Sequence, residues 1–152
     1  MTRSETARIA VVGLMALVLI PAASSARAAP NPCSLLTDAQ VTKALGYKVQ
    51  SHSAGGTALA RSCTWSGPAM GYSQTSPTLI VQASLGSRAR FVRAVARETP
   101  LQGFGGNAYV AMDGALIDAW GNGVTLLFSF DEGATTPKTT IALIRLALAH
   151  TR

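Results

Sequence analysis

The stretch from Ala108 to Phe130 reads AYVAMDGALIDAWGNGVTLLFSF, and it decides the fold because it predicts three strands that pair in sequence. Asp113-Gly114 and Asn122-Gly123 divide it into segments of alternating apolar and other residues. Both dipeptides are strong signals for two-residue hairpin turns, since type I′ turns need positive φ at both central positions. The stretch therefore predicts an antiparallel three-stranded meander.

The two predicted turns can be tested against each other through the register that each one imposes. Val110 is expected opposite Ile117, and Ile117 opposite Phe128. A slip of one residue would move every side chain to the other face and break this agreement. The register gathers six apolar residues on a single face: Val110, Met112, Ile117, Leu126, Phe128 and Phe130.

The opposite face of the meander carries the candidate binding residues. It is more apolar than contact with water alone requires, which is typical of interaction surfaces. A carboxylate among aromatic rings suits a cation or a sugar, although Asp118 is equally consistent with a lone polar residue at a sheet edge. The candidate binding residues are Tyr109, Leu116, Asp118, Trp120 and Leu127.

The rest of the chain predicts helices and strands in the same order twice. Thr37 and Gln40 form a capping box for a helix over 38–45, which ends at Gly46. Ser87 caps a second helix extending to about Glu98, in which Phe91, Val92 and Val95 face the core. Strands are expected at 47–52, 59–66 and 78–85, and the second places Leu59, Arg61, Cys63 and Trp65 on one face. A final helix begins with Thr136-Pro137 and extends to about His150.

This order predicts an α+β fold: an antiparallel sheet from two αβββ units plus a C-terminal helix, with helices mainly on one face. Residues 1–28 are expected to be a cleavable signal peptide, and 29–152 a single domain. The apolar run from Ile9 to Ile20 has about 12 residues, too few to span a bilayer. An A-x-A cleavage site follows at Ala26-Arg27-Ala28.

The expected location is secreted or periplasmic, with no stable membrane anchor. Cys33 follows Asn31-Pro32 rather than the small residue that a lipidation site requires. In an exported chain, two cysteines indicate one structural disulfide between Cys33 and Cys63. A redox pair would favour Cys-x-x-Cys, and a metal site would need more ligands, so no metal or cofactor is expected.

Several of these motifs resemble those of a known group of proteins. They are a Cys-Ser-Leu-Leu-Thr start at Cys33, a Cys-x-Trp strand at Cys63 and a glycine-rich turn over 103–109. Together they resemble a group of small exported bacterial domains of unknown function, many of them lipoproteins. The shared motifs are structural, so the resemblance implies no activity and transfers no functional residues.

Charge and motif content exclude several classes of function. The chain has 13 basic and 7 acidic side chains, and removal of the signal peptide would leave a net charge of roughly +4. Nucleic-acid binding normally needs more charge, clustered with aromatic residues. Arg90, Arg93 and Arg97 are consistent with an anion-binding strip or with a solvated helix face. Neither His52 nor His150 lies in a hydrolase motif.

These observations favour a non-enzymatic binding module in the cell envelope or medium, with no catalytic residue assigned. Its partner would be a protein or a cell-envelope ligand, contacted through the outer meander face and the loop over 67–76. Two alternatives stay open at this point. One is a small envelope hydrolase in which Asp118 shares a pocket with a histidine or Asp131, and the other is a structural protein that binds anionic surfaces.

Overall fold

The computed structural model describes residues 27–69, 76–131 and 137–151. The predicted signal peptide lies outside the described residues, except for its last two positions. Most of the predicted loop over 67–76 and the predicted cap Thr136 also lie outside them.

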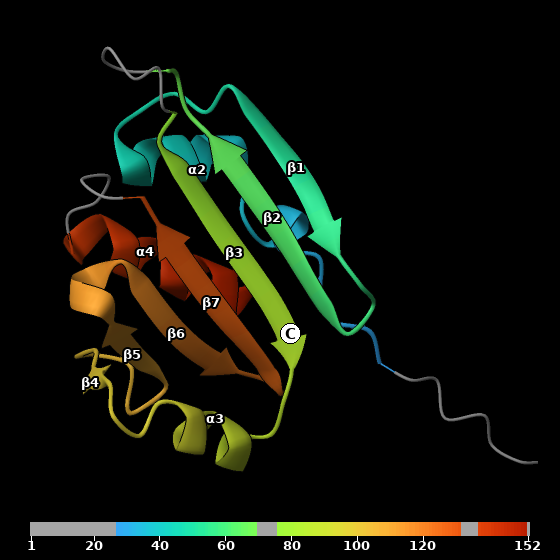
Figure 1. Ribbon diagram of the computed structural model, residues 1–152, viewed down its shortest axis with the longest axis vertical. Coiled ribbons are helices and arrows are strands. Elements are labelled where there is room, and N and C mark those ends of the chain that lie inside the picture. The colour runs from blue at the N-terminus through green and yellow to red at the C-terminus, as the bar shows by residue number, and fades with distance from the viewer. Residues whose placement is uncertain (1–26, 70–75, 132–136, 152) are drawn as a thin grey trace, which may run out of the picture.

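The protein is built on one antiparallel sheet of seven strands, in the order β1-β2-β3-β7-β6-β5-β4 (Figure 1). The strands are β1 (Ser51–Gly56), β2 (Ala60–Ser66), β3 (Thr78–Leu85), β4 (Thr99–Pro100), β5 (Ala108–Ala111), β6 (Leu116–Gly121) and β7 (Val124–Phe130). The helices are α1 (Pro32–Leu35), α2 (Asp38–Leu45), α3 (Arg88–Ala94) and α4 (Pro137–Ala149), with a 3-10 turn η1 (Met112–Gly114). The predicted α+β class is confirmed.

The two predicted αβββ units meet at their third strands, β3 and β7. Each unit is a meander, and the predicted register of the second one is confirmed. Val110 lies opposite Ile117, and Ile117 lies opposite Phe128. Asn122 and Gly123 both have positive φ, 52° and 79°, as a type I′ turn requires.

The other predicted turn is wrong. Ala111 pairs with Leu116, which leaves four residues between the strands rather than two. Three of them form η1, closed by the Ala115 amide donating to the Met112 carbonyl at 3.0 Å. Met112 has a φ of 49° and is 74% exposed, so it does not join the inner face as predicted.

The inner face of the sheet carries the hydrophobic core, and α1, α2 and α4 cover it. In Figure 1, α2 and α4 lie next to each other behind the strands. Buried side chains alternate along the central strands, as in β7, where every second residue is buried. The largest fully buried core residues are Trp65, Phe128, Leu36, Leu79, Leu126, Leu143 and Ile144.

Helix α2 forms where the sequence predicts it. The Gln40 amide donates to the Thr37 hydroxyl at 3.3 Å, and the Thr37 amide donates to the Gln40 side chain at 2.8 Å. Gly46 ends the helix with a φ of 75°. The capping box and the glycine stop therefore act as predicted.

Two predictions in the first unit are wrong. The first strand lies at 51–56 rather than 47–52, so it includes residues expected in a turn. It is an edge strand with every residue exposed, and such a strand has no buried face to give its sequence a pattern. Leu59, expected on the same strand face as Cys63 and Trp65, lies before β2 and is 71% exposed, whereas Cys63 and Trp65 are buried.

Helix α3 is shorter than predicted and lies apart from the other helices, at the lower end of the sheet in Figure 1. It ends at Ala94 rather than near Glu98. Phe91 and Val95 are buried as expected, but Val92 is 43% exposed and does not face the core. The sequence does not predict the short helix α1 or the short strand β4.

Candidate binding site on the outer sheet face

The five candidate binding residues share one face of the sheet, which we call the outer face. Tyr109, Asp118 and Leu127 are direct cross-strand neighbours on β5, β6 and β7. Leu116 and Trp120 lie two residues before and after Asp118, so they point to the same side. All five are half-buried. The register thus brings together the whole predicted set, while its role in binding stays a prediction.

Helix α3 packs on part of this outer face, where it contacts the aromatic residues of β5 and β6. The ring of Phe91 meets the ring of Tyr109 edge-on, with centroids 5.7 Å apart. The Trp120 indole N–H donates to the Gly86 carbonyl at 3.3 Å, just before the helix. The Arg88 guanidinium lies 5.7 Å from the Trp120 ring centroid. Tyr109 and Trp120 therefore attach α3 to the sheet.

Beside α3 the outer face is hollowed. This cavity, the α3 hollow, has a volume of about 470 Å³, within the usual range for small-ligand sites. Its walls come from α3, the ends of β3 and β7, β6, and the β1–β2 connection. The lining residues are Leu59, Ser84, Leu85, Gly86, Arg90, Phe91, Ala94, Asp118 and Thr125.

Asp118 in this lining is paired with a second acid, Glu98. Burial, the Asp118 charge and a hydrogen bond to Asp118 all raise the pKa of Glu98. Burial also raises the pKa of Asp118, and the hydrogen bond with Glu98 opposes that rise. One oxygen of Glu98, Oε2, is buried without a hydrogen-bond partner. Two carboxyl groups in such an arrangement resist ionising together, so the pair holds a proton more readily than isolated acids do.

Sequence reasoning missed Glu98. The sequence predicts that Glu98 ends a helix, whereas the chain leaves the helical path at Val95 and enters the two-residue strand β4. No local signal marks so short a strand, and only the pairing of Pro100 with Tyr109 places this segment beside Asp118.

Among the residues that the structure describes, Arg90 is the one cation that lines the α3 hollow. Among the described residues the single ion pair joins His52 to Asp38 at 2.8 Å, so Arg90 has no carboxylate partner there. Arg93 and Arg97 are also exposed on or just after α3, but they do not line the hollow. Of the three arginines predicted to form an anion-binding strip, one therefore lines the hollow and two lie on the open surface.

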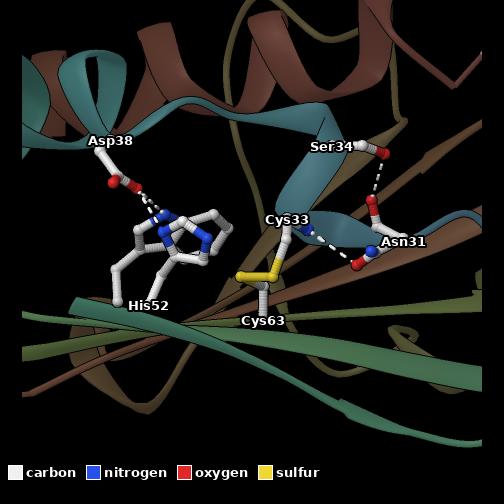
Figure 2. Close-up of a disulfide and its surroundings, with 7 residues drawn as sticks. Asn31, Cys33, Ser34, Asp38, His52 and Cys63 are labelled. Carbon is white, nitrogen blue, oxygen red and sulfur yellow. Dashed lines mark hydrogen bonds and ion pairs between the residues drawn. A yellow bond between two sulfur atoms is a disulfide. The ribbon is translucent and has the colours of Figure 1, made fainter.

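The Cys33–Cys63 region is a structural junction. The disulfide is present, with the two Cα atoms 5.2 Å apart, and it ties α1 to β2 (Figure 2). The Asn31 side chain accepts from the Cys33 amide at 3.1 Å and so caps α1. Asp38 at the start of α2 accepts from the Trp65 indole N–H at 3.1 Å and contacts His52 (Figure 2).

The hydrolase alternative required a pocket that joins Asp118 to a histidine or to Asp131. The α3 hollow contains neither. Asp131 lies beyond the far end of β7, where it accepts from the Thr78 amide and hydroxyl. The Nδ1 atom of His150 contacts the Leu35 carbonyl at 2.8 Å.

Comparisons with protein-family models, with curated proteins and with solved structures gave no match. The resemblance to small exported domains therefore stays a prediction. Within the described part of the chain, no group of three or more His, Cys, Asp or Glu side chains could hold a metal ion. No described helix is long and apolar enough to cross a membrane.

Proposed function

We propose that the protein is an exported, non-enzymatic binding module that takes its ligand in the α3 hollow. The observation that carries the proposal is the composition of this cavity. It combines apolar walls with one arginine and one carboxyl group, on the face of the sheet that α1, α2 and α4 leave uncovered. Apolar walls with a few placed polar groups are typical of ligand sites.

The two kinds of lining residue would contribute differently to binding. Apolar surface buried against Leu59 and Leu85 would supply about 25 cal/mol per Å². Arg90 and Asp118 would fix the orientation of the ligand, because they offer charge and directed hydrogen bonds. The aromatic residues first proposed as contacts, Tyr109 and Trp120, would act mainly by holding α3 in place.

The disulfide supports the exported location that forms part of this proposal. Disulfides persist in the periplasm and outside the cell and are rare in the cytosol. The Cys33–Cys63 bond is therefore consistent with a secreted or periplasmic protein whose partner is a protein or a cell-envelope ligand.

Filling the hollow tests the proposal. Ser84→Phe places a ring in the cavity, whereas Ser129→Phe places the same ring on the outer face, away from the cavity lining. Both serines are half-buried on strands of the same sheet, so the pair is matched. We expect Ser84→Phe to abolish capture of ligand from the native medium or envelope fraction, with Ser129→Phe behaving as wild type. Equal capture by both variants would contradict the proposal.

A second candidate function rests on the Glu98–Asp118 pair. Carboxyl groups with raised pKa beside a cavity are an arrangement used for acid–base catalysis. An envelope hydrolase of this kind would lose activity in Asp118→Asn and in Glu98→Gln, in a screen against ester, peptide and glycoside substrates. A screen without turnover by the wild type would remove this candidate.

A further inference from the structure

We infer that the α3 hollow binds a small amphiphilic carboxylate, with its anionic head at Arg90 and its hydrocarbon part against the apolar wall. This inference rests on the proposed function, since it names the ligand class of the same cavity. Two features of the lining carry it: the arginine and the apolar surface.

Arg90 supplies an uncompensated positive charge. It is exposed on α3, lines the hollow, and has no ion-pair partner among the described residues. A guanidinium group presents several N–H donors in a plane that matches the two oxygens of a carboxylate. A ligand anion would therefore meet an unpaired donor rather than displace a carboxylate of the protein.

Asp118, the carboxyl group in the described lining, interacts with Glu98 and forms no ion pair with Arg90. Burial raises its pKa, and its hydrogen bond is to another carboxyl group, Glu98. The pair carries less negative charge than two separate acids, and the hydrogen bond that raises the pKa of Glu98 keeps the shared proton between the two carboxyl groups.

The apolar wall favours a ligand with a hydrocarbon part. It is formed by Leu59, Leu85, Phe91 and Ala94. Leu59 is 71% exposed at the rim, so a ligand would cover apolar surface that now contacts water. In the described part of the lining, the hydroxyl groups are those of Ser84 and Thr125, too few to satisfy a ligand that is polar throughout.

The charge of the ligand can be tested with three probes that share one eight-carbon chain: octanoate, octanol and octylammonium. Each is titrated into the purified protein at pH 7, with affinity from calorimetry and location from amide shifts in NMR spectra. We expect octanoate to bind most tightly, about tenfold better than octylammonium, because its head group meets Arg90. The amides of Ser84 and Thr125 should shift.

Matched variants assign the effect to Arg90. Arg90→Gln should weaken octanoate binding by about tenfold and leave octanol binding unchanged. Arg93→Gln changes the same charge on the same helix outside the hollow and should bind octanoate as the wild type does. Both sites are exposed, so both variants should fold.

The outcomes separate this inference from the proposed function. Tighter binding of octylammonium at the same amides would overturn the carboxylate class and keep the hollow as a site. Absence of shifts at Ser84 and Thr125 with all three probes would also overturn the inference. If, in addition, Ser84→Phe captured native ligand as the wild type does, the proposed function would fail as well.

Discussion

At the scale of single residues, the Glu98–Asp118 pair links stability to pH. Both groups have raised pKa values in the folded protein, so the unfolded chain releases their protons at a lower pH than the folded state does. Their contribution to stability is therefore complete below the pKa of the unfolded acids. It is lost as the pH rises through the raised folded values.

Glu98→Gln should reduce this pH dependence. The amide carries no charge at any of these pH values, so the repulsion between the two acids disappears. We expect the variant to gain stability relative to wild type at neutral pH and to differ less from it at acidic pH. Urea unfolding at several pH values measures this. A variant that loses as much stability at neutral as at acidic pH would contradict the assigned coupling.

The sequence predicts one member of this pair and not the other. Asp118 is placed by the alternation of β6 between two hairpins, and alternation is a local property of a strand. Glu98 reaches Asp118 only because the chain turns after α3 and pairs two residues with β5. That pairing depends on contacts between distant segments, which leave no pattern in the sequence around Glu98.

At the scale of elements, α3 is attached to the outer face through Phe91. We predict that Phe91→Ala lowers the free energy of unfolding by about 3 kcal/mol, at the lower end for a buried aromatic residue because the helix lies at one end of the sheet. Amide hydrogens of α3 should also exchange faster. Val92→Ala, on the exposed flank, should change stability by less than about 0.5 kcal/mol.

Equal effects of these two variants would show that α3 is not held by the Phe91–Tyr109 contact. The helix itself is predictable from its sequence, because its N-cap is local. The Arg90 N–H donates to the Ser87 hydroxyl at 3.3 Å. The face of the sheet on which it packs does not follow, since the spacing of Phe91 and Val95 fits either face.

Of the two hairpin turns in the second meander, one is predictable from local sequence and the other is not. Asn122-Gly123 forms the predicted turn, because both residues take positive φ. At the other hairpin, positive φ falls on Met112 and Gly114, and a 3-10 turn replaces the two-residue connection. The strand registers are nevertheless those predicted, because burial of alternate apolar residues fixes them.

At the scale of the whole molecule, the disulfide joins the helical layer to the sheet. Replacing Cys33 and Cys63 by serine together should cost about 3–4 kcal/mol of unfolding free energy, from the entropy of a loop of 30 residues. Denaturant unfolding of the double variant measures this, and reduction of the wild type should give a similar loss. An unchanged midpoint would show that the bond adds no stability.

The sequence predicts the two halves of the architecture but does not predict how they join. Capping, hairpin and alternation signals predict two αβββ units and a final helix. They do not predict that β3 pairs with β7, since nothing local relates strands that far apart in the chain. The edge strand β1 was misplaced for a related reason: its residues are all exposed, so burial leaves no pattern in its sequence.

The central claim is that the ligand of this protein occupies the α3 hollow. Amide shift mapping by NMR tests it most directly, with isotope-labelled protein titrated with extract of its native medium or envelope. The account predicts shifts at Ser84, Asp118 and Thr125, and none in the Ser84→Phe variant. Shifts confined to the exposed edge strand β1 or to α2, with these three amides unmoved, would contradict it.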